Sequence, residues 1–253
     1  MSDAVVTGRG FATTTEPRAR RRWSATRVAG SSVLIAWAGL FWFLWITGRD
    51  AYYLSQRTTW VVPVAAVLLT AAAAGRLLTA RTTLAEPIAR KELAVMAAMV
   101  VPVLLVVSLP PATLGTFSAG KRAGFSGVGV MTTASDIGSG ELTLVDVAAA
   151  QTTPEGEKAL GKRAGDSVDF VGFVTRYDDT PADEFLLTRY VVTCCVADAT
   201  VAQVRVVNAM PGAFADNDWV EVKGAIYPLG REVIVNANAI DGVPRPSKPY
   251  LTP

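Results

Sequence analysis

Histidine is absent from this chain of 253 residues, and charged side chains are scarce. Without histidine, the sequence lacks the commonest general base and the commonest ligand of transition metals. Charged residues make up 18 % of the chain, against about 25 % in typical soluble domains, and the deficit falls in the first half. The formal net charge of +2 gives no basic field for nucleic acid, so we expect no nucleic-acid partner. Two cysteines cannot build a disulfide framework.

Long apolar runs fill the first half of the chain. A polar, Arg-rich tail (1–27) comes first, and we expect it to be disordered. A helix of about 20 residues crosses the hydrocarbon core of a bilayer, and three runs in the region 28–110 have about this length. They are 28–48, 60–78 and 93–109. The first run is too long for a signal peptide and has no good cleavage site, so we predict three retained transmembrane helices.

Basic residues in the short flanks predict how the helices are oriented. The tail carries six arginines. The segment between the second and third runs carries three basic residues, and Arg76 near the end of the second run adds a fourth. The segment between the first and second runs carries only Arg49 and Arg57. Because the flanks richer in Lys and Arg stay in the cytoplasm, we expect a cytoplasmic N-terminus in the cell membrane. Three crossings then place everything after Pro111 outside the cytoplasm.

The predicted spans have almost no ionisable residue near their centres. A conducting pore or a proton relay usually needs such residues. We therefore interpret these helices as an anchor in the lipid bilayer, or as the part of a subunit that packs on a larger membrane protein.

The second half of the chain changes to a β pattern. A Gly- and Ser-rich segment (111–140) is typical of a flexible linker, a β-domain follows (141–241), and a Pro-rich tail (242–253) is expected to be extended or disordered. Predicted strands cover 167–174, 184–195, 203–207, 219–227 and 233–240. Gly172 and Gly224 each lie mid-strand, where glycine allows a sheet to bend. We predict an OB-like five-stranded barrel, with a flat α+β sheet as the alternative.

Cys194, Cys195 and Asp198 are the candidate site residues. Adjacent side chains on a regular strand point to opposite faces, so the two thiols diverge if the strand continues through Cys195. A bulge or a strand end at this point lets them converge. Two thiolates then suit a soft divalent metal such as zinc, with Asp198 as a third ligand or as an orienting acceptor.

Two alternatives to a metal site stay open for the cysteines. Adjacent Cα atoms are about 3.8 Å apart, below the usual disulfide range, so a vicinal disulfide would be strained and easily reduced, as in a redox sensor. In the second alternative, Cys194 is a small residue of the core and Cys195 has no chemical role. Because the chain has no histidine to activate a thiol, we expect no enzyme.

The segment from Arg189 to Ala199 reads RYVVTCCVADA, and with Val171–Val174 and Trp219–Gly224 it resembles the YcgQ-type family of bacterial permease subunits. The resemblance implies a membrane-anchored protein whose partner is a separate multi-span permease, with a link to metal handling. We therefore hypothesise an accessory subunit of a membrane permease, whose extracytoplasmic domain binds a soft metal ion or a thiol-reactive solute. The alternatives are an extracellular protein-docking module and a thiol redox sensor.

Overall fold

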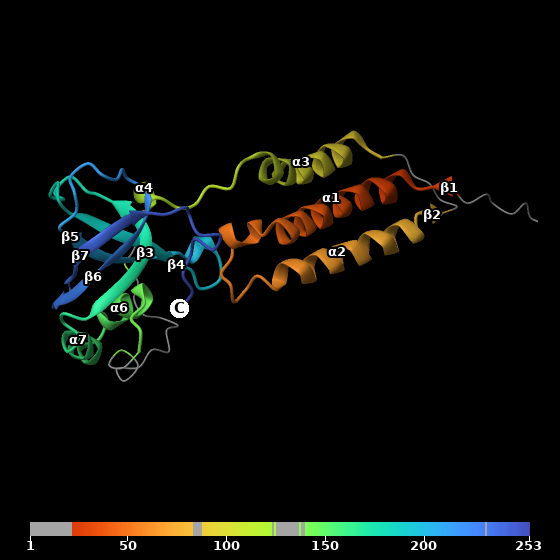
Figure 1. Ribbon diagram of the computed structural model, residues 1–253. Coiled ribbons are helices and arrows are strands. Elements are labelled where there is room, and N and C mark those ends of the chain that lie inside the picture. The colour runs from red at the N-terminus through yellow and green to blue at the C-terminus, as the bar shows by residue number, and fades with distance from the viewer. Residues whose placement is uncertain (1–21, 83–87, 123, 125–136, 138–139, 231) are drawn as a thin grey trace, which may run out of the picture.

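Three long helices lie side by side, and a β-barrel sits at one end of them (Figure 1). The computed structural model describes residues 22–82, 88–122, 124, 137, 140–230 and 232–253. Most of the tail predicted to be disordered lies outside these residues. Its last part is ordered, since β1 (Arg22–Trp23) pairs with β2 (Arg81–Thr82) and the first long helix begins at Ala25.

The long helices are α1 (Ala25–Thr47), α2 (Val61–Leu78) and α3 (Arg90–Ser108). Each is long and apolar enough to cross a membrane, which confirms three long apolar helices where the spans were predicted. Helix α1 begins where the Ser24 side chain accepts a hydrogen bond from the Arg27 N–H, and ends at Gly48, whose φ of 66° suits glycine. A short 3₁₀ helix, η1 (Arg49–Tyr52), and a turn connect α1 to α2.

Helix α1 lies between the other two and contacts both of them. Two of its tryptophans help to fix this arrangement. The indole N–H of Trp37 donates to the Met99 carbonyl on α3 at 3.1 Å, and that of Trp42 donates to the Thr70 hydroxyl on α2 at 3.2 Å. The outer faces of α2 and α3 stay exposed and apolar, as expected of surfaces that meet lipid or another membrane protein.

The segment after α3 is attached to the barrel where the structure describes it. The Tyr190 hydroxyl donates to the Gly115 carbonyl at 2.7 Å, and the Thr116 N–H donates to Asn217 Oδ1 at 2.8 Å. Helix α4 (Thr116–Ala119) follows and packs near β3. The prediction of a flexible linker is therefore wrong for this part, because these polar contacts hold it against the domain. Residues 125–136 of the predicted linker lie outside the described residues.

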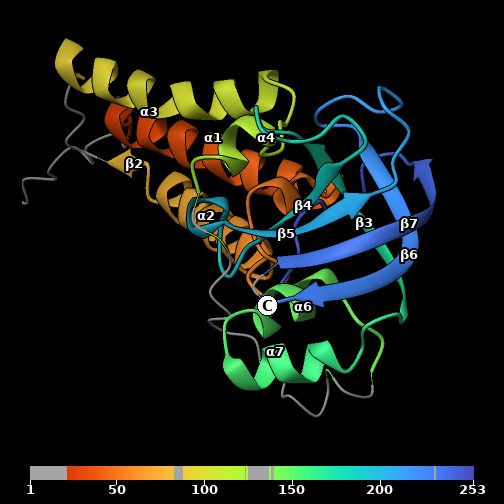
Figure 2. The same cartoon turned by 90° about the vertical axis from the view of Figure 1, so that its left-hand side faces the viewer.

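Two short helices precede the barrel and cover one part of it (Figure 2). Thr143 and Asp146 form a capping box at the start of α6 (Leu144–Ala150). Thr153 caps α7 (Pro154–Gly161), and Pro154 lies at its first position. Their apolar faces, including Val147 and Leu160, join the core of the barrel.

The strands form a closed five-stranded barrel in the order β3-β4-β5-β7-β6. Neighbours are antiparallel except β5 and β7, which are parallel. This confirms the OB-like barrel, and the flat sheet is not found. The strands are β3 (Ser167–Thr175), β4 (Phe185–Val191), β5 (Thr200–Val207), β6 (Trp219–Leu229) and β7 (Glu232–Gly242). The register shifts between Lys223 and Gly224, which bends β6 at a predicted glycine.

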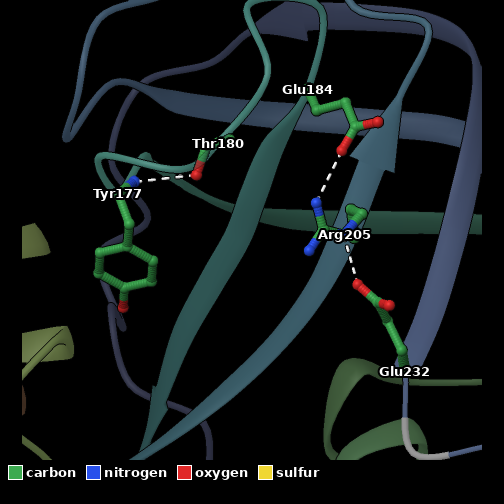
Figure 3. Close-up of polar contacts among 5 residues, drawn as sticks. All are labelled: Tyr177, Thr180, Glu184, Arg205 and Glu232. Atoms are coloured by element: carbon green, nitrogen blue, oxygen red, sulfur yellow. Dashed lines mark hydrogen bonds and ion pairs between the residues drawn. The ribbon is translucent and has the colours of Figure 1, made fainter.

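A polar network joins three parts of the barrel at its surface (Figure 3). The Arg205 guanidinium on β5 pairs with Glu184, just before β4, at 2.8 Å, and also with Glu232 at the start of β7. Nearby, the Tyr177 N–H donates to the Thr180 hydroxyl at 3.0 Å and closes a turn. Arg205 therefore has its positive charge matched by two carboxylates.

Candidate functional site

Strand β4 ends at Val191, four residues before the predicted end at Cys195. The prediction of a regular strand through both cysteines is therefore wrong. The physical reason is Asp198, whose carboxylate accepts hydrogen bonds from the N–H groups of Thr193 at 3.1 Å and Cys194 at 2.8 Å. These N–H groups bond to a side chain and not to a neighbouring strand. A short 3₁₀ helix, η2 (Val196–Asp198), then leads into β5.

The two thiols converge because the strand has ended. Cys194 Sγ lies 3.8 Å from Cys195 Sγ. The Cys194 side chain is exposed and that of Cys195 is half-buried, and both are free thiols. The interpretation of Cys194 as a buried core residue is therefore wrong. The segment 192–198, which we call the cysteine loop, presents a pair of neighbouring sulfurs to solvent.

Asp198 controls the protonation of this loop. A hydrogen bond to Asp198, then one to Cys195, raises the pKa of the Cys194 thiol to about 11. For Asp198 itself, partial burial acts to raise the pKa. Hydrogen bonds from Cys194, Thr193 and Cys195 outweigh this effect and lower the pKa below its ordinary value. At neutral pH, Asp198 is therefore a carboxylate and Cys194 a thiol.

The spacing of the sulfurs bears on metal binding. A tetrahedral zinc with Zn–S bonds of about 2.3 Å holds two sulfurs about 3.8 Å apart. The observed separation of 3.8 Å fits this geometry. Within the described part of the chain, no three Cys, Asp or Glu side chains group as ligands for one metal ion. Asp198 faces backbone N–H groups, so its role as a third ligand stays a prediction.

The backbone of the cysteine loop contacts the connection between α1 and α2. The Cys194 carbonyl accepts hydrogen bonds from the Ser55 N–H at 3.1 Å and the Thr58 hydroxyl at 2.7 Å. The Val196 N–H donates to the Tyr53 carbonyl at 2.9 Å. Figure 1 shows the ends of α1 and α2 meeting the barrel at this place. The candidate site thus lies where the β-domain joins the membrane helices.

The C-terminal tail forms the third side of this junction. The Leu251 N–H donates to the Tyr190 carbonyl at 2.8 Å, and the Val192 N–H donates to the Leu251 carbonyl at 2.9 Å. Tyr250 is buried against Tyr190, with the rings edge to face. The Pro-rich tail is therefore extended along the end of β4.

Arg189 fixes the tail from inside the domain. Its guanidinium donates to three backbone carbonyls, those of Pro249 at 3.1 Å, Val171 at 3.1 Å and Lys248 at 3.2 Å. Burial lowers its pKa to about 10. Its side chain points inward and lies over the Trp219 ring at 5.3 Å.

Sequence reasoning found the cysteine loop but missed the two segments that contact it. Neither the connection at 53–58 nor the tail at 248–251 carries a motif. A weak signal of a buried tail was the pair Tyr250-Leu251 in an otherwise polar, Pro-rich segment.

Comparison with known proteins identifies the second half of the chain. No curated protein has a sequence that matches. Residues 132–253 match the family of the DUF1980 C-terminal domain, and this range includes the barrel, the cysteine loop and the tail. The YcgQ-type resemblance and the permease that it implies stay predictions. Three helices long and apolar enough to cross a membrane thus precede a region that matches the DUF1980 C-terminal domain.

Proposed function

We propose that this protein is a non-enzymatic accessory subunit of a membrane permease, and that Cys194 and Cys195 bind a soft metal ion such as zinc. The observation that carries the proposal is the pair of sulfurs 3.8 Å apart on an exposed loop. Two thiolates at this spacing occupy two corners of a tetrahedral site. Asp198, water or a side chain of the partner would complete it.

A metal ion can displace the proton that Asp198 helps to keep on Cys194. Cysteine binds metal as a thiolate, so binding releases protons and becomes weaker as the pH falls. The raised pKa of Cys194 therefore lowers the apparent affinity at neutral pH. A site of this kind suits a subunit that binds and releases its ion rather than one that stores it.

The arrangement of the helices supports a membrane partner. Helix α3 contacts α1 but leaves most of its apolar surface exposed, with Leu93, Val101 and Leu104 among the exposed side chains. A multi-span permease packing on this face would bring the metal site close to its extracytoplasmic surface. The basic flanks support the predicted orientation, in which the β-domain lies outside the cytoplasm.

A second function is favoured by a different observation. The Cys194 carbonyl holds the loop on the membrane helices through Ser55 and Thr58. This contact within the chain supports a structural role for the cysteine loop, as the alternative of a protein-docking module with structural cysteines requires. A redox sensor is less well supported, because the sulfurs would have to approach to about 2.05 Å and the raised pKa of Cys194 disfavours the reactive thiolate.

Zinc binding by the purified full-length protein in detergent tests the metal proposal. We expect about one zinc ion per chain, and at least a tenfold loss of affinity when both cysteines are replaced by serine. Thr193→Ser, at the neighbouring position, is the matched control and should bind as the native protein does. Equal zinc binding by the native protein and the double variant would overturn the metal proposal.

The permease proposal needs a separate experiment. The chain is co-expressed with a multi-span membrane protein encoded beside it, and the two are purified through a tag on one of them. We expect a stable complex in lipid nanodiscs, and transport that depends on both proteins. Failure of the two proteins to co-purify, together with unchanged transport when this chain is absent, would contradict a subunit role.

A further inference from the structure

A pocket of about 360 Å³ lies at the junction between the membrane helices and the C-terminal tail. The connection after α1 forms one wall through Asp50, Ser55 and Thr59, and the tail forms the other through Lys248 and Tyr250. Its volume falls in the range of about 300–1,000 Å³ that small-molecule sites occupy. The pocket is separate from the thiols, although Ser55 contacts the cysteine loop.

Asp50 is the unusual residue of this pocket. It is only 8 % exposed, yet its carboxylate makes no hydrogen bond or ion pair with any part of the chain that the structure describes. Among the same residues, every side-chain polar atom fully shielded from solvent has a partner. The Asp50 oxygens must therefore reach open space, and the pocket is the open space that Asp50 lines.

The basic residues near Asp50 are directed elsewhere. Arg49 lies over the Phe43 ring at 5.0 Å, and Arg245 lies over the Tyr52 ring at 5.1 Å. Lys248 lines the same pocket, but its ammonium donates to Gln56 Oε1 at 3.2 Å. The Asp50 carboxylate faces the pocket with no partner among the described residues, so this site favours a ligand that supplies a positive group.

The surroundings of Asp50 define the ligand further. Helix α1 ends at Thr47, next to Gly48, which lines the pocket, so the negative end of the helix dipole lies near this region. The hydroxyls of Ser55 and Thr59 can accept hydrogen bonds, and the Tyr250 ring can lie against a cation. Across the pocket, Lys248 can bind an anionic group. The complementary ligand therefore carries an ammonium group and an anionic group a short distance apart.

We propose that this pocket binds a phosphoethanolamine group, with its ammonium on Asp50 and its phosphate on Lys248. The group can come from the headgroup of phosphatidylethanolamine or from a free soluble compound. Exposed Trp45 and Trp60 at the adjoining ends of α1 and α2 place the pocket near headgroup level, where such tryptophans are enriched. This proposal does not depend on metal binding by the cysteines.

Native mass spectrometry of the full-length protein in detergent tests the proposal. The probes are phosphatidylethanolamine, phosphatidylglycerol, which lacks the ammonium group, and free O-phosphoethanolamine. We expect the native protein to retain phosphatidylethanolamine or to bind free O-phosphoethanolamine, and the arm that responds identifies the source. Because a charge-assisted hydrogen bond is lost, Asp50→Asn should weaken that binding about tenfold or more. Asp179→Asn, on a distant turn, should leave it unchanged.

The proposal would be overturned if neither ethanolamine probe bound, or if the native protein and Asp50→Asn bound the probe equally. Thermal unfolding separates a ligand site from a purely structural role. Without ligand, Asp50→Asn should not lower the melting temperature, since the Asp50 carboxylate has no partner to lose among the described residues. It should also abolish the rise that the bound ligand gives the native protein. A lower melting temperature without ligand would mean that Asp50 stabilises the fold, and would contradict the proposal.

Discussion

The hydroxyl of Thr58 donates a hydrogen bond to the carbonyl oxygen of Cys194 at 2.7 Å. This contact joins the connection between two membrane helices to the loop that carries both cysteines. The same carbonyl also accepts the Ser55 N–H at 3.1 Å, so its acceptor capacity is filled. The backbone of the cysteine loop thus holds the domain on the helices, while the exposed thiols stay available for chemistry.

Replacing Thr58 by valine tests this joint. Valine keeps the shape of threonine but cannot donate, so the variant should lose about 1 kcal/mol of stability at the junction. We expect faster hydrogen exchange at the amides of 193–198, with little change in the core of the barrel. Thr59→Val is the control, because the Thr59 hydroxyl donates to Gln56 within its own turn. Equal effects of the two variants would show that the contact with Cys194 contributes nothing.

Asp198→Asn should make Cys194 more reactive. The hydrogen bond to the Asp198 carboxylate is the largest cause of the raised pKa of Cys194, about 11 against an ordinary 9.0. Removing the negative charge lowers this pKa and increases the thiolate fraction at pH 8, about tenfold or more. The rate of alkylation by iodoacetamide, measured in a Cys195→Ser background, reports the change. Asp183→Asn should leave the rate unaltered, and an unchanged rate in Asp198→Asn would refute the assignment.

Asp198 and Cys194 make the free energy of unfolding depend on pH, at acidic pH through Asp198 and at alkaline pH through Cys194. The lowered pKa of Asp198 contributes stability that is present above its unfolded value of about 3.9 and is lost as the pH falls through the folded pKa. The raised pKa of Cys194 contributes stability below 9.0 that is lost as the pH rises toward 11. Asp198→Asn should therefore flatten the stability profile at both ends, which chemical denaturation across this pH range can measure.

Arg189→Lys should release the C-terminal tail. The guanidinium donates to three carbonyls in a fork that a single ammonium group cannot reproduce, and two of these carbonyls belong to Lys248 and Pro249. We expect a loss of about 2 kcal/mol or more, since hydrogen bonds from a buried charge are involved. Limited proteolysis should cleave the variant near the tail at a rate at which the native protein is intact. Arg176→Lys, on a nearby turn, serves as the control.

The barrel could be predicted because its signals are local. Short β-rich runs, turn clusters and two mid-strand glycines are properties of neighbouring residues, and the membrane spans are visible as apolar length. The end of β4 could not be predicted in the same way. Cys194 follows a continuous β-rich run, and only the hydrogen bonds from its N–H and that of Thr193 to Asp198 end the strand.

The junction escaped prediction for a related reason. Thr58 and Cys194 are far apart in the chain. Thr58 contributes its hydroxyl group and Cys194 its backbone carbonyl, and no sequence motif indicates that these groups meet. An arginine on a strand usually lies at the surface, but Arg189 is buried. Its inward direction depends on the tail returning to supply carbonyls, which is a property of the folded chain alone.

Gly224→Ala should strongly destabilise the barrel. A methyl group at this position would lie 2.2 Å from the Asn236 carbonyl oxygen on β7, so the two strands would have to separate at the bulge. Overpacking of this kind costs about 1–3 kcal/mol, and here the obstacle is backbone that cannot rotate away.

Gly161→Ala is the matched control, because nothing lies within 4 Å of the added methyl group at the end of α7. Since alanine favours helix over glycine, this control should be neutral or slightly stabilising. Urea unfolding of the full-length protein, followed by tryptophan fluorescence, compares the two variants, and a neutral Gly224→Ala would contradict the close approach of β6 and β7.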